Sequence, residues 1–261
     1  MLKSKETLSP EEQRIYFALS ERTDRIFTIE TVRALEIVAS GTLRFLLSDM
    51  TKKGWLTRLR KGVYYVNEPS GKNFEDFFKI ATYVFNGYLA FASALRVYGA
   101  ITETPYTVYV ATRNTSDRKN IGNMEIRAVA LRKRAIGVTK HDGYTVSSRA
   151  KTLYDCFYLP EYAGGYSKII EAIRSMQLKP EEWKEFLSYV NTFDKSSSKR
   201  KIGYLLSMAN KIGSRVPANV IRQLNERGAL AKLGSSGRGK YVKEWNVMDY
   251  LGEGYLLGWS K

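Results

Sequence analysis

Two polar side chains four residues apart, Arg44 and Ser48, stand out because both types can hydrogen-bond to base edges in DNA. A basic stretch follows them, since the ten residues 52–61 hold five cationic side chains and no acidic one. Such a concentration is typical of phosphate contacts, which position a protein on nucleic acid without reading its sequence. We therefore assign base contacts to Arg44 and Ser48, and phosphate contacts to Lys53, Arg58, Arg60 and Lys61.

A helix and a hairpin would have to hold these side chains. Apolar residues at Leu43, Leu46, Leu47 and Met50 have the spacing of one buried helix face. We expect Ser40 to cap this helix and Gly54 to end it in a left-handed conformation. Residues 55–59 and 63–66 flank the basic turn 60–62 and are predicted to form a hairpin.

Two shorter helices precede this unit. Ser9, Pro10, Glu11 and Glu12 predict a capping box and a helix that ends near Ser20, and Thr28 can cap a second helix over about 29–36. Three helices and a hairpin are the order of a winged helix-turn-helix, whose third helix enters the major groove. The predicted DNA-binding residues are Ser40, Thr42, Arg44, Phe45, Ser48, Lys52, Lys53, Arg58, Arg60, Lys61 and Tyr64. Asp49 would oppose phosphates unless Lys52 or Lys53 pairs with it, and a winged helix used for protein contacts is the alternative.

The rest of the chain predicts a mixed α+β region with a largely helical C-terminal part. After a linker over 68–73 we expect one helix over 74–84 and a second helix that ends at Gly99. Strands are predicted over 105–112, 123–131 and 143–146, and a polar, mobile segment over 115–122. Helices follow over 149–157, 165–176, 179–189, 199–211 and 216–226, with a basic loop over 235–240 and a strand over 241–245. The unit 216–245 is either a second nucleic-acid element or, as we favour, a cap on the core. The predicted domains are 1–70 and 71–261, with 161–261 as a helical sub-part.

The positive net charge indicates either a polyanionic partner or a role in keeping the protein soluble, and the candidate catalytic residues give little support for an enzyme. The net charge of +16 divides as +3 over residues 1–70, +6 over 71–160 and +7 over 161–261. The part that holds the predicted helix and hairpin therefore carries the smallest share of the net charge, and its cations are concentrated in residues 52–61. One cysteine and one histidine exclude an intramolecular disulfide and a four-ligand Cys/His zinc site. We expect His141 to be a turn residue and Cys156 a buried, inert thiol. Carboxylates such as Glu125 and Asp155 lack metal-ligand spacing, so we predict no catalytic residue, metal or cofactor. We also predict no membrane segment and a cytoplasmic protein.

Four segments in a fixed order carry a resemblance to a known family. They are GWLTRLRKGVYYV over 54–66, YLAFASALRVYGAI over 88–101, PYTVYVAT over 105–112 and VSSRAKTLYDCF over 146–157. Together they resemble the AbiEi antitoxin family, and RKIGYLL over 200–206 also matches a helix of that family. The chain departs from the family pattern at Ser148, where proline is usual, and over 149–151, where Glu-Arg is usual. The resemblance spans about residues 10–210.

The resemblance implies a transcriptional regulator of a phage-defence locus. Its winged helix would repress its own operon at a double-stranded operator, for which we expect an inverted repeat bound by two copies. Its C-terminal domain would counteract a nucleotidyltransferase-like toxin without a stable complex. We assign the basic surface of that domain to Arg132, Lys133, Arg134, Arg149, Lys151, Lys199 and Arg200. The alternative is an RNA- or protein-binding regulator that acts mainly through the basic residues 71–261.

Overall fold

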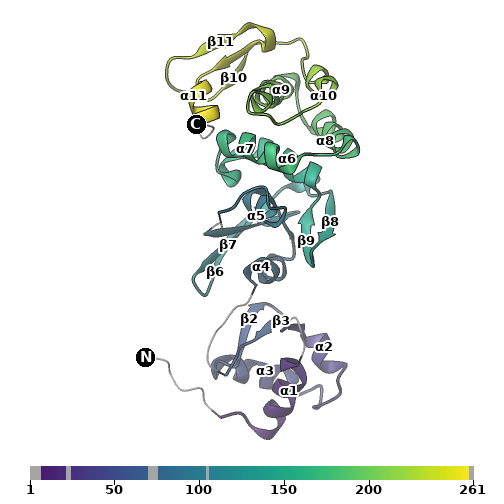
Figure 1. The fold of residues 1–261 in the computed structure, drawn as a ribbon. Helices are drawn as coiled ribbons and strands as arrows, with labels where there is room; N and C mark the ends of the chain where they lie inside the picture. The colour runs from purple at the N-terminus through teal and green to yellow at the C-terminus, as the bar shows by residue number, and fades with distance from the viewer. Residues whose placement is uncertain (1–6, 22–24, 70–75, 104–105, 259–261) are drawn as a thin grey trace.

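The structure, a computed structural model, describes residues 7–21, 25–69, 76–103 and 106–258. The chain progresses along one long axis, from the first three helices at one end to a small three-stranded sheet at the other (Figure 1). Its mixture of helices and sheets, with a winged-helix arrangement at the N-terminal end, confirms the predicted α+β class. Most of the predicted linker 68–73 lies outside the described residues.

The N-terminal unit packs three helices against a small sheet. The helices are α1 (Pro10–Ser20), α2 (Ile29–Arg33) and α3 (Leu43–Lys52), and the strands are β1 (Ile26–Thr28), β2 (Leu56–Arg60) and β3 (Val63–Val66), in the order β1-β3-β2. Both predicted caps are present, since the Ser9 and Thr28 side chains accept from the backbone N–H groups of Glu12 and Thr31. The core of this unit holds the predicted apolar face of α3, together with Ile15, Leu19 and Leu56.

The two ends of α3 compare differently with prediction. Gly54 takes the left-handed conformation at φ +81°, and the N–H groups of Gly54 and Trp55 donate to the carbonyls of Thr51 and Met50 in a Schellman motif, as expected. The expectation that Ser40 caps the helix is wrong. The helix begins two residues later, with Thr42 as the N-cap, because residues 39–42 form a turn closed by the Thr42 N–H and the Ala39 carbonyl.

A six-stranded mixed sheet forms the middle of the molecule. Its strands are β4 (Tyr88–Leu89), β5 (Thr107–Thr112), β6 (Asp117–Ile121), β7 (Met124–Ala130), β8 (Val138–His141) and β9 (Tyr144–Ser147), in the order β6-β7-β5-β4-β9-β8. Helices α4 (Phe77–Phe85) and α5 (Phe91–Val97) flank it. The predicted partnership of β5 and β7 is confirmed, and the pair is parallel. The segment 115–122, expected to be polar and mobile, contains a strand that the sequence did not indicate, because residues 117–121 pair with β7 at the edge of the sheet.

The C-terminal part is mainly helical. It contains α6 (Arg149–Tyr158), α7 (Tyr166–Met176), α8 (Pro180–Phe193), α9 (Ser196–Lys211), α10 (Ala218–Gln223) and α11 (Glu253–Leu257), with short 3₁₀ turns η1 (Arg132–Arg134), η2 (Pro160–Ala163) and η3 (Lys243–Trp245). A last sheet joins β10 (Ala231–Leu233), β12 (Val247–Asp249) and β11 (Lys240–Val242). Trp245 is buried against Gly203 of α9, so this tail covers the helical core.

A shared apolar cluster joins the hairpin β2–β3 to the middle sheet. Leu59, Val63 and Tyr65 from the hairpin are buried with Ile80 and Val84 of α4. Successive residues of β3 point to opposite faces, so Tyr64 and Val66 belong instead to the core of the N-terminal unit. All four residues of β3 are therefore buried, and the hairpin is packed on both faces.

Candidate nucleic-acid interface

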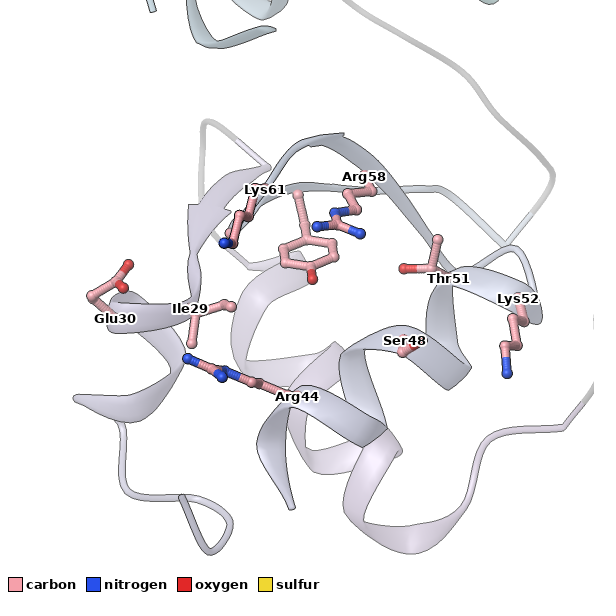
Figure 2. A pocket seen from close by; sticks show the side chains of 10 residues that line it. Ile29, Glu30, Arg44, Ser48, Thr51, Lys52, Arg58 and Lys61 are labelled. Atoms are coloured by element: carbon pink, nitrogen blue, oxygen red, sulfur yellow. The ribbon is translucent and has the colours of Figure 1, made fainter. Parts of the chain in front are cut away.

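A hollow of about 600 Å³ lies between α2, α3 and the hairpin β2–β3. Figure 2 shows its polar side chains entering from different elements, with Arg44 and Ser48 on α3 and Arg58 and Lys61 on the hairpin opposite. The complete lining is Ile29, Glu30, Arg44, Ser48, Thr51, Lys52, Arg58, Lys61, Gly62 and Tyr64. The fold thus brings the two predicted base-reading residues together with three of the predicted cations and Tyr64.

Helix periodicity accounts for the positions of Arg44 and Ser48. The side chains at Leu43, Leu46, Leu47 and Met50 are buried in the N-terminal core, whereas Arg44 and Ser48, four residues apart, both stay exposed. The opposite wall depends on strand pairing. Arg58 faces Tyr64 across the β2–β3 ladder, which places both side chains on the hollow's side of the hairpin. The Tyr64 ring is itself fixed by stacking on Phe27, at 5.6 Å between centroids.

Arg60, predicted to contact phosphates as Lys61 does, is exposed but does not line the hollow. One extra residue between Arg58 and Arg60 shifts the register, so that Arg60 pairs with Val63 rather than continuing the Arg58 face. Gly62, at φ +76°, closes the turn after it. Arg60 Nε donates to the Tyr83 carbonyl of α4 at 2.8 Å. This arginine therefore ties the hairpin to the middle of the molecule.

Lys53 also differs from its predicted role as a free phosphate contact. Its Nζ lies 2.7 Å from the Glu12 carboxylate and 2.8 Å from that of Asp49, and its side chain is only 15% exposed. Hydrogen bonds to Asp49 and Glu12 raise the pKa of Lys53, and Lys53 in turn lowers the pKa of Asp49. The structure thus selects Lys53, not Lys52, as the partner that balances Asp49.

The remaining predicted DNA contacts lie outside the hollow. Ser40, Thr42 and Phe45 are exposed near the start of α3, and the Phe45 side chain is 71% exposed. One acidic group does line the hollow, because Glu30 sits at its α2 end, toward which Arg44 extends (Figure 2). Backbone and Thr28 hydrogen bonds lower the pKa of Glu30, with a further contribution from Arg33 and Arg44. Charge around the hollow is therefore mixed at that end and cationic at the other.

The predicted basic surface of the C-terminal part is wrong for its two buried members. Lys151 and Arg200 are buried, the first paired with Asp155 and the second bonded to the Glu226 carbonyl. Arg134 donates to the Tyr154 hydroxyl and the Phe193 carbonyl. Arg149 pairs with Glu182 and Lys199 with Glu226. Of the seven residues, only Arg132 and Lys133 are exposed, because the others satisfy polar groups of the helical core.

Sequence reasoning missed Lys119, which joins the sheet to the hairpin. Its Nζ donates to the Leu59 carbonyl at 2.6 Å. Burial, followed by the nearby Arg58, lowers the pKa of Lys119. No local signal marks this residue, since it lies in the polar segment expected to be mobile and its partner is 60 positions away.

The cysteine and the histidine considered for catalysis lie in different elements, Cys156 in α6 and His141 in β8. Cys156 is buried as expected, and burial raises the pKa of its thiol well above the ordinary value. His141 ends strand β8 instead of lying in a turn, and its ring is 4.8 Å from that of Tyr98. Over the described residues, no three His, Cys, Asp or Glu side chains gather as metal ligands. No helix in that part of the chain is long and apolar enough to cross a membrane.

Comparison with known proteins places this geometry in context. The crystal structure of the RV2827C protein from Mycobacterium tuberculosis matches with a TM-score of 0.65, covering 94% of this chain and 93% of that one at 13% identity. It shows a shared fold through nearly the whole chain. No curated protein matches. Residues 14–67 match the family model of the transcriptional regulator, AbiEi antitoxin. The predicted resemblance to the AbiEi antitoxin family of transcriptional regulators is thereby confirmed for residues 14–67, which run from within α1 to just after β3.

Proposed function

We propose that this chain is a DNA-binding repressor of its own operon and the antitoxin of a nucleotidyltransferase-like toxin. The observation that carries the DNA part is the hollow, where a helix with two outward polar residues faces a hairpin that bears cations. In a winged helix the third helix enters the major groove while the wing contacts the adjacent backbone. Arg44 and Ser48 read base edges in this arrangement, and Lys52, Arg58 and Lys61 neutralise phosphates.

Three further predicted residues complete the proposed contact surface. Thr42 and Ser40 reach the backbone beside the helix, and the exposed Phe45 ring makes an apolar contact such as that with a thymine methyl group. Two copies bind an inverted repeat, one per half-site, as winged-helix repressors commonly do. The proposed boundary between the reading domain 1–70 and the antitoxin domain 71–261 falls at the predicted linker.

Fluorescence anisotropy with the DNA upstream of the gene tests the repressor function. Arg44→Ala removes a base contact, so it lowers affinity for the operator by about 1–3 kcal/mol while changing affinity for unrelated duplex much less. Arg222, an exposed arginine on α10, provides the matched control Arg222→Ala, which leaves both affinities unchanged. Equal affinity of the unaltered chain for operator and unrelated duplex contradicts the proposal.

Co-expression tests the antitoxin function. Expression of a neighbouring nucleotidyltransferase-like toxin arrests growth, and this chain restores growth without co-purifying with the toxin. Arg44→Ala retains the rescue, because the antitoxin role is assigned to residues 71–261. Failure of the full chain to rescue growth at matched expression refutes the antitoxin assignment and leaves the operator experiment unaffected.

A further inference from the structure

The outer strands of the middle sheet present a row of side chains that the DNA hollow does not use. In the β5–β7–β6 register, Tyr109 pairs with Arg127 and Arg127 pairs with Arg118, so these three lie side by side on one face. Both arginines are exposed. Like charges placed directly opposite each other destabilise a sheet. Within the described residues, Arg127 contacts the Tyr162 ring at 5.0 Å from its centroid, and neither guanidinium has a carboxylate partner.

Three tyrosines surround a hollow of about 420 Å³ next to this row. They are Tyr106, whose side chain is 93% exposed, and the half-buried Tyr109 and Tyr162, whose ring centroids are 5.4 Å apart. Its volume lies within the range of about 300–1,000 Å³ typical of ligand sites. The hollow therefore offers aromatic side chains to an incoming planar group, with Arg127 beside the Tyr162 ring and Arg118 on the next strand outward.

Three acidic residues lie near the hollow. Glu103 is held by Lys168 Nζ at 2.7 Å, and this contact lowers its pKa. Glu125, below Arg127 on the same face, accepts a hydrogen bond from the Thr107 hydroxyl. Glu161 is the exposed carboxylate of the lining. A carboxylate there can accept from an exocyclic amino group of a nucleobase.

We propose that this sheet face binds a single-stranded nucleic acid. Its bases stack on Tyr106, Tyr109 and Tyr162, and its phosphates contact Arg118 and Arg127. Aromatic platforms with adjacent cations are the general means by which proteins hold single strands, because an unpaired base exposes its π-face and a paired one does not. A duplex cannot place base faces in the tyrosine hollow. An acidic peptide would satisfy the arginines and leave the rings without partners.

Anisotropy of labelled single strands of about 12 nucleotides, one of RNA and one of DNA, tests this site. The full chain carries Arg58→Ala and Lys61→Ala throughout, so that the winged-helix hollow contributes little to binding. In this background we test two variants. One carries Tyr106→Ala, and the other carries both Arg118→Ala and Arg127→Ala. Matched controls are Tyr241→Ala, whose side chain is 52% exposed on β11, and Arg222→Ala on α10. All five altered positions, which are Tyr106, Arg118, Arg127, Tyr241 and Arg222, are exposed, so we expect the variants to fold.

We expect Tyr106→Ala to weaken single-strand binding by at least about fivefold, since one stacked base is lost. Removal of both arginines should reduce the slope of log affinity against log salt by about 1.4, because each phosphate contact on a single strand contributes roughly 0.7. The controls leave both quantities unchanged. Tighter binding of RNA than DNA identifies a contact to the 2′-hydroxyl, and equal binding identifies contacts to bases and phosphates alone; both support the site.

Three results overturn the proposal. The first is single-strand affinity that none of the sheet-face changes alters. The second is an equal loss of affinity for unrelated duplex, which would make this face an extension of the duplex surface. The third is competition by oligoglutamate as strong as that by unlabelled single strand, which would make it a site for acidic peptides. None of these results bears on operator binding by the winged helix, so the two proposals fail separately.

Discussion

Adjacent lysines with the same charge should differ in their effect on DNA binding. Lys52 lines the hollow and is exposed, whereas Lys53 is held by Glu12 and Asp49. We therefore expect Lys52→Met to remove one phosphate contact and Lys53→Met to remove none. Replacement by methionine keeps a long, flexible side chain, so that the comparison isolates the charge.

The magnitude follows from counting the cations assigned to phosphates. Lys52, Arg58 and Lys61 give three contacts per copy, and each contributes about 0.9 to the slope of log affinity against log salt, for a total of about 2.7. Between about 50 and about 200 mM salt, one copy on a half-site should lose about 40-fold in affinity. After Lys52→Met the slope falls to about 1.8, and the loss over the same range falls to about 12-fold.

Anisotropy titrations on a half-site duplex at four or more salt concentrations measure these slopes. Lys53→Met should keep the slope of the unaltered chain. It should instead lower the melting temperature, because the buried Glu12 carboxylate loses its cation. Circular dichroism at the titration temperature verifies that both variants are folded. Equal decreases in slope for the two variants, or a decrease for Lys53→Met alone, would refute the division of roles between these lysines.

Three further predictions concern the helical C-terminal part. Lys151→Met alone should destabilise the chain by about 3–5 kcal/mol in urea denaturation, because it leaves buried Asp155 without a cation, and adding Asp155→Leu should recover most of this loss. Burial raises the pKa of Asp155 from 3.8 to about 6, so ionisation of this carboxyl costs more in the folded state. The free energy of unfolding should therefore fall as pH rises from about 4 to about 6. Asp155→Asn should make this fall shallower, and an unchanged pH dependence would contradict the raised pKa. Gly203→Ala would place a Cβ 2.1 Å from a ring carbon of Trp245, so it should lower the free energy of unfolding by about 1–3 kcal/mol. The displaced indole should also become more accessible to fluorescence quenchers. Unchanged quenching would contradict the packing of the tail on α9.

The N-terminal unit was largely predictable because its signals are local. The capping residues Ser9 and Thr28 lie within three positions of the N–H groups that they accept from, and Gly54 acts on the turn immediately before it. The apolar face of α3 follows from spacing within ten residues. The start of α3 was misplaced because Ser40 and Thr42 both have cap-forming side chains, and the turn over 39–42 decides between them.

The errors at the candidate site come from partners that are distant in sequence. Lys53 is paired with Glu12, 41 positions away, and Arg60 is turned by a register shift that composition does not reveal. The polar strand β6 has one buried residue, Ile121, so neither alternation nor apolar content marks it. Lys151 lies in α6, where every residue from Ala150 to Phe157 is buried. The sequence of this helix includes Lys151, Thr152 and Asp155 among its apolar residues, so its pattern does not mark the lysine as a core residue.

The hairpin that presents Arg58 to the hollow is also part of the middle sheet's core. Tyr64 lies on the hollow's side and Tyr65 on the side of α4, so both faces of β3 are buried. Arg60 and Lys119 each add a hydrogen bond across the second of these contacts. A wing fixed in this way cannot swing on its own, because any rotation would expose apolar side chains and break both bonds. The position of the hairpin's cations relative to α3 therefore depends on the contacts of the hairpin with α4 and β6, and a change in either element should reach the hollow through this hairpin.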